Sequence, residues 1–506
     1  DFVPSQPIQV ELYSAREHFA VRTSGLPNIG IQGVCFGKTV AAMSPKSEPF
    51  NWGNVVWHEL GHVFAIQLSK NHVPRWFTEG LSEYETIAKE PSWQRELDPQ
   101  LYSAIKANRL PGAVDMNQAF THAESAMDVT VAYYAASQMI LFSVEEWGMT
   151  GIRKALALWG EGKKTPEVLK LAFGASPEEY DRRFRAWALG RMKRYDAQWL
   201  FDERPMPLEK AKAAAEKDPK NARLQADFAF ALIAERKLDE GKKALAAALA
   251  LDPKQREALY LSAKIALGGK KVDEAKTLLA KLIDVGGDGY TARTMLADIA
   301  EATKDKAAFR LHSEAAHRWD PDQVEPLQGL YDLATSEKRD DDRVTILRDL
   351  VRLDQHDPRP WRNLLALLVE KKAYGEARKL GEQAVFVAVN DGRVHASYAK
   401  SLEELGDARG ALFEYESAAL CENKPEDEAR IQDAFAGLLE KQGKKTEAAA
   451  HRKEADEARK AVKPAGKPGA EGDDEEDDED HDHEDPHGPA KPAGEKGREA
   501  AKPKGK

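Results

Sequence analysis

A 34-residue period runs through the second half of the chain and limits the folds that this half can adopt. The dipeptide Asp-Pro occurs at 218–219 and 252–253, Gly-Gly follows at 286–287, and Asp-Pro returns at 320–321. A single helix pair of this length cannot bury its apolar face alone, so successive pairs stack and share a continuous core. We therefore expect residues 205–460 to form an all-α solenoid of about seven repeats.

Small residues recur within these units at places where two helices must approach closely. They are Ala229, Gly241, Ala248, Ala263, Ala275, Ala377, Ala384, Ala399, Gly406, Ala411 and Ala418. Asp357-Pro358 comes 37 residues after Asp320, and this longer interval predicts an insertion near residues 339–342. A generic Ala-rich helical bundle would need no fixed period. The period and its small positions resemble the tetratricopeptide repeat family, which implies a concave groove that holds a peptide or a protein partner.

The formal net charge of −11 comes from one segment. Residues 471–485 hold 12 acidic residues and no Lys or Arg, so the rest of the chain is close to +1. A nucleic-acid-binding protein normally carries a basic excess or stripe, and we therefore expect no nucleic acid partner. No apolar run approaches the roughly 18 residues of a membrane helix, so we predict no membrane span in this chain.

Residues 461–506 are of low complexity, acidic and His-containing at first and Lys-rich afterwards. High charge with little apolar content cannot offset the entropy of ordering, so we predict a disordered tail. His481, His483 and His487 could hold a metal ion weakly, but a solvated acidic tail is the simpler interpretation.

Residues 1–204 have a different texture, with β-branched clusters and turn residues near the start. Residues 8–13 and 34–43 are predicted as short strands, and the pattern becomes helical after about residue 54. A small sheet followed by helices is typical of an α+β domain. The chain begins with Asp1, which we interpret as a processed or truncated N-terminus. The compartment therefore stays open between the bacterial cell envelope and the cytoplasm.

The sequence HELGH, at residues 58–62, is the most informative stretch for chemistry. His58 and His62 are four residues apart on a predicted helix, so both imidazoles project from one face. Such a pair can bind one zinc ion through ring nitrogens at about 2.0–2.1 Å. Glu59 lies beside that position, where its carboxylate can take a proton from water.

Glu79 is the candidate third ligand. It lies at the start of a second predicted helix, and the short connection 69–75 joins this helix to the first. Two helices joined in this way can place Glu79 opposite both histidines, which gives the His2Glu set of catalytic zinc with one position open for water. Glu83, one turn further on, either orients a ligating histidine or is a plain solvated glutamate. His72, in the connection, is a weaker candidate ligand.

HELGH followed by PRWFTEGLSEYE resembles the gluzincin metallopeptidases, in particular the bacterial peptidase-MA-like domains that are fused to tetratricopeptide repeats. The resemblance extends over about residues 8–200. It implies a zincin-like fold with a substrate-binding edge strand within residues 33–45. By this likeness the zinc ligands are His58, His62 and Glu79, and the general base is Glu59.

The gluzincin family also uses a tyrosine on a later helix to stabilise the oxyanion. Here the predicted helix 129–148 offers two adjacent tyrosines, about 100° apart around the axis, so only one can face the metal. We prefer Tyr134, which has Ser137 three residues on, to Tyr133, which has Ala136 three residues on. We expect Tyr133 to pack in the core.

These features predict a zinc-dependent peptidase that recruits a peptide or protein substrate, or a protein partner, through its repeats. Aminopeptidases of the aminopeptidase N family carry a Gly-x-Met-Glu-Asn motif upstream, and nothing like it precedes His58, which favours an endopeptidase. The alternative is a non-catalytic tetratricopeptide scaffold with a retained peptidase fold. Because every proposed catalytic group lies before residue 135, we expect the first half to hold its metal and to act without the repeats.

Overall fold

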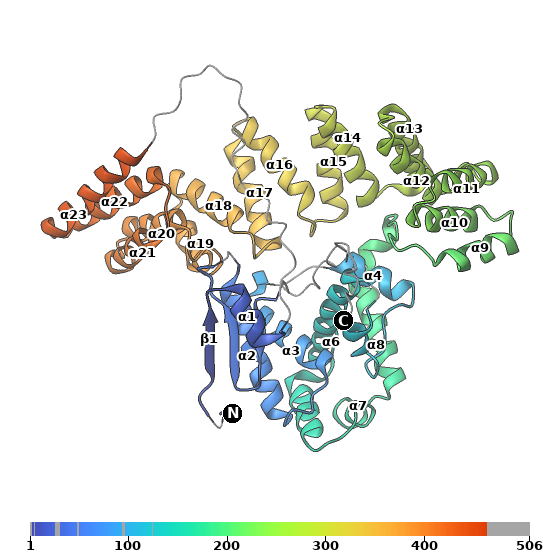
Figure 1. Cartoon of the computed structure of the whole chain (residues 1–506), viewed down its shortest axis with the longest axis horizontal. Coiled ribbons are helices and arrows are strands. Elements are labelled where there is room, and N and C mark those ends of the chain that lie inside the picture. Colours follow the sequence, from blue (N-terminus) through green and yellow to red (C-terminus); the bar gives the residue numbers. More distant parts are fainter. Residues whose placement is uncertain are drawn as a thin grey trace, which may run out of the picture.

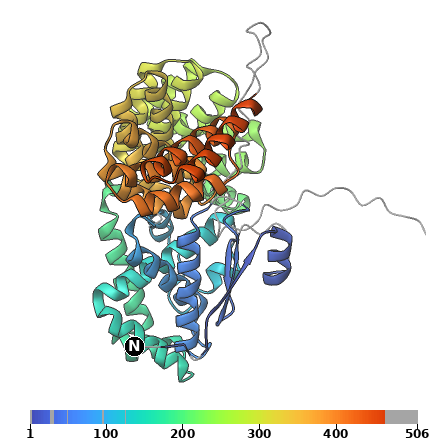
Figure 2. The ribbon, with the colours of Figure 1, turned by 90° about the vertical axis from the view of Figure 1, so that its left-hand side faces the viewer.

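The computed structural model describes residues 3–4, 6–25, 31–47, 50–93, 97–123 and 125–462. Within these ranges the chain has two parts, a small sheet covered by helices and a curved array of helix pairs (Figure 1). The view turned by a quarter shows the array lying across the first part (Figure 2). The predicted disordered tail, 461–506, lies outside the described residues except for its first two positions.

Three strands form one mixed sheet in the order β1-β3-β2. β1 is Gln9–Tyr13, β2 is Gly33–Cys35 and β3 is Thr39–Met43. β1 pairs parallel with β3, and β2 pairs antiparallel with β3 on the other side. The region 34–43, predicted as one strand, is therefore a hairpin of two strands. β3 is buried along its whole length because it is the central strand, whereas β2 forms an edge.

Two helices follow the sheet and form a helical hairpin. α2 spans Trp52–Leu68 and α3 spans Arg75–Lys89. α2 begins where the Asn51 side chain accepts a hydrogen bond from the backbone N–H of Asn54, which satisfies one open donor of the first turn. α2 also packs on β2 and β3, so the hairpin lies beside the edge of the sheet.

The remaining helices complete the first part. They are α1 (Arg16–Thr23), η1 (Pro91–Trp93), α4 (Asp98–Lys106), α5 (Gln118–Thr121), α6 (Ala126–Gly160), α7 (Thr165–Phe173), α8 (Pro177–Arg191) and η2 (Lys193–Ala197). The apolar side chains of α4 to α8 and η2 share one core with those of α3, whereas Phe19 of α1 belongs to a separate small core with Ala41 and Met43 of β3. Trp76, Phe77, Phe142 and Tyr180 are among the fully buried members of the larger core.

α3 packs closely against both α2 and α6. A side-chain carbon at Gly61 of α2 would lie 2.7 Å from Ser82 Oγ of α3. A side-chain carbon at Gly80 of α3 would collide with the backbone oxygen of Ala136 on α6. Glycine at these two positions therefore lets the three helices approach each other more closely than any other residue would.

The second part of the described chain is a lead helix, α9 (Leu208–Lys217), followed by seven helix pairs. The pairs are α10 (Ala222–Ala234) with α11 (Leu238–Leu251), α12 (Arg256–Gly268) with α13 (Val272–Leu282), α14 (Tyr290–Ala302) with α15 (Lys306–Trp319), α16 (Glu325–Ser336) with α17 (Asp340–Leu353), α18 (Pro358–Glu370) with α19 (Tyr374–Val387), α20 (Gly392–Glu404) with α21 (Ala408–Leu420), and α22 (Pro425–Lys441) with α23 (Lys445–Ala461). A short π-helix, η3 (Ile283–Gly287), follows α13. The expected all-α solenoid is confirmed. None of the helices in the described ranges combines the length and the apolar content that a membrane span requires.

The turn inside each successive pair from α10 to α21 falls at a constant spacing of 34 residues. The residues with positive φ at these turns are Arg236, Lys270, Lys304, Lys338, Lys372 and Gly406. The predicted insertion near residues 339–342 is therefore wrong. The counterpart of Asp320, which ends α15, is Asp354, which ends α17 at the regular interval. Asp357 instead caps the N-terminus of α18, so its Asp-Pro pair has a different structural role.

Replacement of Gly80 by alanine should destabilise the first part. The added methyl group would overlap the Ala136 carbonyl, and overpacking of this kind costs about 1–3 kcal/mol. Gly190→Ala is the matched control, since a side-chain carbon there has no neighbour within 4 Å and α8 should tolerate or prefer alanine. Calorimetric unfolding of the two full-length variants measures the difference. Equal unfolding temperatures would contradict the close packing of α3 on α6.

Candidate metal centre

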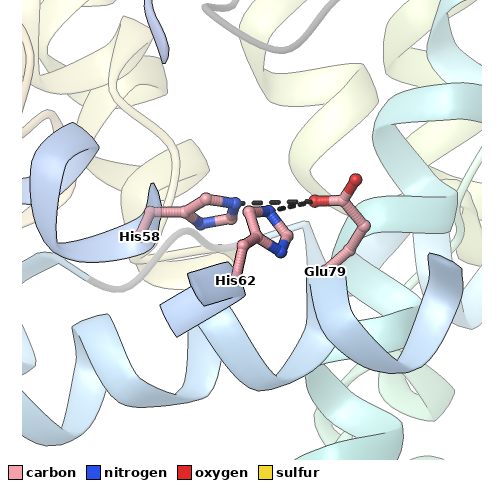
Figure 3. Close-up of side chains that lie close together, drawn as sticks. All are labelled: His58, His62 and Glu79. Atoms are coloured by element: carbon pink, nitrogen blue, oxygen red, sulfur yellow. Dashed lines mark ion pairs between the residues drawn. The ribbon is translucent and has the colours of Figure 1, made fainter. Parts of the chain in front are cut away.

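Three buried side chains from the α2–α3 hairpin converge on one point (Figure 3). His58 and His62 lie one turn apart on α2, and Glu79 faces them from the first turns of α3. Glu79 Oε2 is 3.5 Å from His58 Nε2 and 3.2 Å from His62 Nε2. All three ligand atoms lie within 4.8 Å of one another. The three residues singled out by the HELGH motif and its spacing to Glu79 are thus brought together.

The separation of these atoms fits a tetrahedral ion. With bonds of about 2.0–2.1 Å, the ligand atoms of tetrahedral zinc are about 3.4 Å apart, close to the two distances from Glu79. Two imidazoles and one carboxylate are also a donor set that zinc accepts in catalytic sites. The residues present therefore fit a zinc ion.

The electrostatics of the cluster favour positive charge at the same point. Burial by itself lowers the pKa of His58, but the carboxylates of Glu79 and Glu83 outweigh it and raise this pKa to about 10. Burial opposes ionisation of Glu79, yet the two imidazoles hold its pKa well below its usual range. The anionic carboxylates favour a positive charge between them and the imidazoles. Either a proton or a metal ion can provide this charge.

Both histidines are also held by their second ring nitrogen. Glu83 Oε1 lies 3.3 Å from His58 Nδ1, so Glu83 occupies the orienting position rather than a solvated one. Thr78 Oγ1 lies 2.9 Å from His62 Nδ1. Such contacts fix the orientation of a ligating imidazole and its tautomer. No sequence motif singled out Thr78, although it directly precedes Glu79.

The Glu59 side chain lies against Gly33 of the edge strand β2. Its side chain is 3% exposed, and its Oε2 atom has no hydrogen-bond partner among the described residues. A side-chain carbon at Gly33 of β2 would lie 2.8 Å from Glu59 Oε1, so glycine in the edge strand makes room for this carboxylate. Burial raises the pKa of Glu59. A buried carboxylate with a free oxygen beside two histidines is suited to accept a proton.

The positions of the two tyrosine hydroxyls contradict the predicted preference for Tyr134 over Tyr133. Tyr134 is buried, and its hydroxyl donates a hydrogen bond to Asp98 Oδ1 at 2.7 Å and accepts one from Arg191 at 2.9 Å. Ser137, its proposed companion, donates to the Tyr134 backbone oxygen at 2.8 Å. Tyr134 therefore ties α6 to α4 and α8, which is a structural role.

Tyr133 is the tyrosine that is linked to the three converging side chains, through Arg75. Its hydroxyl accepts a hydrogen bond of 2.8 Å from Arg75 Nη2, and Arg75 Nε donates to Glu79 Oε1 at 3.2 Å. Burial and the negative charge of Glu79 raise the pKa of Tyr133, so the phenol keeps its proton. Arg75 was not anticipated, although it lies one helical turn before Glu79. His72, the weaker candidate, is exposed in the turn and is not part of the cluster.

Comparisons with known proteins describe the repeats. Residues 232–299 match the family model described as tetratricopeptide repeat, so the chain contains tetratricopeptide repeats, as its period predicted. No curated protein matches the chain. Because the family match covers only the solenoid, it carries no information on the metal centre.

Solved structures with partial likeness are also known. MamA from Desulfovibrio magneticus is 14% identical and covers 35% of this chain and 99% of its own, with a TM-score of 0.30. The repeat protein YrrB is 16% identical over 37% of this chain and 96% of its own, with a TM-score of 0.31. A tetratricopeptide repeat protein from Parabacteroides merdae is 14% identical over 46% and 91%, with a TM-score of 0.27. These TM-scores are too low to support any conclusion about function.

Loss of any one of the three converging side chains should abolish stoichiometric zinc. His58→Ala, His62→Ala and Glu79→Ala each leave two donors, whereas His72→Ala removes an exposed histidine of the same hairpin and should keep one zinc per chain. Metal analysis of the purified full-length variants after dialysis provides the test. Stoichiometric zinc in Glu79→Ala would show that the third ligand is misassigned.

Proposed function

We propose that this protein is a zinc-dependent peptidase, an endopeptidase rather than an aminopeptidase, whose repeats bind a substrate or partner protein. The observation that carries the proposal is the combination of a convergent His2Glu set with the buried carboxylate of Glu59 beside it. A structural zinc site is closed by four protein ligands and has no use for an additional carboxylate with an unpaired oxygen beside the ligand set.

Each side chain then has a definite task. Zinc, when bound by His58, His62 and Glu79, polarises a carbonyl and lowers the pKa of water. Glu59 takes the proton from the attacking water and passes it to the leaving amine. Tyr133 donates a hydrogen bond to the negative charge that develops on the scissile carbonyl oxygen.

Three neighbours act through these groups. Glu83 and Thr78 hold the two imidazoles in the orientation that a metal ion requires. Arg75 contacts both Glu79 and the hydroxyl of Tyr133, so it fixes the phenol relative to the ligand set. Arg75 can only donate hydrogen bonds, so in its contact with Arg75 the Tyr133 hydroxyl is the acceptor and keeps its own proton.

The second candidate function is a protein-interaction scaffold that does not hydrolyse peptides. The family match supports this alternative more directly than the enzyme, because it concerns the repeats alone. Both functions share a solenoid that binds a protein partner, and they differ only in the task of Glu59. Variants of Glu59 therefore separate them.

Replacement of Glu59 by glutamine should separate metal binding from hydrolysis. Glu59→Gln should keep one zinc per chain, because the side chain is not among the converging ligands. Its rate of digestion of an unfolded protein should fall by at least roughly 10²-fold, since the general base is lost. Glu17→Gln, on the exposed face of α1, is the control and should digest like the parent. If neither the parent nor any variant digests the substrate in a chelator-sensitive way, the scaffold is the better description.

The two adjacent tyrosines should respond differently to loss of the hydroxyl. Tyr133→Phe should lower kcat by roughly 10²–10³-fold with zinc retained, as expected when one oxyanion donor is removed. Tyr134→Phe should instead lower the unfolding temperature, because its buried hydrogen bonds with Asp98 and Arg191 are lost. Steady-state kinetics and calorimetry on both variants give the comparison. A larger loss of kcat in Tyr134→Phe would reverse this assignment.

A further inference from the structure

In the α2–α3 hairpin, which carries the proposed ligands, a short loop joins the two helices at one end only. The turn 69–74 joins the C-terminus of α2 to the N-terminus of α3, so the N-terminus of α2 and the C-terminus of α3 lie at the opposite, open end. His62 and Glu79 are the ligands nearer the turn. His58 and its partner Glu83 are nearer the open end.

The solenoid contacts the α2 side of this open end through the turn between α17 and α18. Asn54 Nδ2 donates a hydrogen bond to Gln355 Oε1 at 3.3 Å, and both side chains are buried. The backbone N–H of Asn51 donates to His356 Nδ1 at 3.4 Å. Asn54 lies one helical turn before His58, so the contact reaches almost to the first ligand.

The solenoid contacts the α3 side of the open end through α19. Gln383 Nε2 donates to Glu90 Oε2 at 3.2 Å, and Glu90 is the residue that ends α3. Phe386 and Trp93 both lie against the backbone of Gly53, because a side-chain carbon at Gly53 would be 3.3 Å from the first ring and 3.2 Å from the second. One helix of the solenoid therefore touches both arms of the hairpin.

We propose that the repeats hold the open end of the α2–α3 hairpin together, and that Gln355 and Phe386 are positioning residues for the metal centre. The inference rests on the proposed zinc site. With the turn at one end and the solenoid at the other, the separation of the two helices is fixed on both sides of the ligands. Without the solenoid, the arms separate at the open end, and the contact between His58 and Glu83 is the first to lengthen.

The first half should therefore lose metal affinity without the repeats, contrary to the expectation from the sequence. All ligands do lie before residue 135, but the contacts that fix their spacing come from residues 355–386. The buried hydrogen bond between the amides of Asn54 and Gln355 is a further reason to expect that the first half needs the repeats. A buried amide must find a partner, so separation of the two parts would leave these groups to water and remove the apolar cover of Phe386.

The test uses the full chain and Co²⁺ alone as the probe. The double variant Gln355→Ala, Phe386→Ala should bind Co²⁺ about tenfold more weakly than the parent, the scale seen when orienting neighbours of ligands are lost. The visible absorption bands of bound Co²⁺ should also shift, because they report the arrangement of its ligands. Amide hydrogen exchange should quicken within residues 51–58 and 83–90 and stay unchanged near the turn 69–74.

The control is Phe413→Ala, which removes another phenylalanine of the solenoid, 65% exposed on α21. It should leave affinity, spectrum and exchange as in the parent. Co²⁺ affinity, spectrum and exchange that are unchanged in the double variant would overturn the inference while the proposed function stands. A parent that binds neither Co²⁺ nor Zn²⁺ would overturn the proposed function, and the exchange measurement would still decide whether the solenoid holds the hairpin.

Discussion

The separation of α2 and α3 is the constraint on which the rest of the structure depends. The contacts of Glu79 with the two imidazoles, at 3.2 and 3.5 Å, leave little room for the helices to move apart. Glycines at 61 and 80 allow the close approach from within the domain. A change of a few tenths of an ångström in this spacing would alter the fit to a metal ion more than any change in the identity of the outer residues.

The sequence predicted that His58 and His62 lie together because local helix geometry fixes their positions. Residues four apart on a helix share a face whatever surrounds them, so His58 and His62 had to lie together once α2 formed. The phase of α6 is not fixed in this way. Residues 134–140 are all buried, so the helix has no polar face that marks its orientation, and the side that meets the metal depends on packing with α3 and α4. The sequence of α6 therefore does not show which of Tyr133 and Tyr134 faces the α2–α3 hairpin.

The 34-residue period predicted the repeats, but it did not predict which residues form the turn inside each helix pair. Most of the residues with positive φ in the turns inside the described helix pairs are lysine or arginine, which carry no turn signal, whereas glycine stands there at 406 and 443. The period was recognised from the Asp-Pro pairs instead. Asp320-Pro321 follows the end of α15, whereas Asp357-Pro358 begins α18, so the interval between these two pairs falsely indicated an insertion. Contacts between the two parts were not predictable at all, because they join residues about 300 positions apart.

The fixed period also determines how the solenoid supports the first part. The turn at 320–324 contacts η2, where Tyr195 donates to Asp320 at 3.3 Å and Arg194 lies 3.6 Å from Asp98, the partner of Tyr134. The next turn, one period later, contacts α2 through Gln355. Two successive repeats thus contact η2, next to the Asp98 partner of Tyr134, and α2 of the hairpin. Because these contacts come from successive repeats, a change in the stacking of the two repeats would displace both contacts at once.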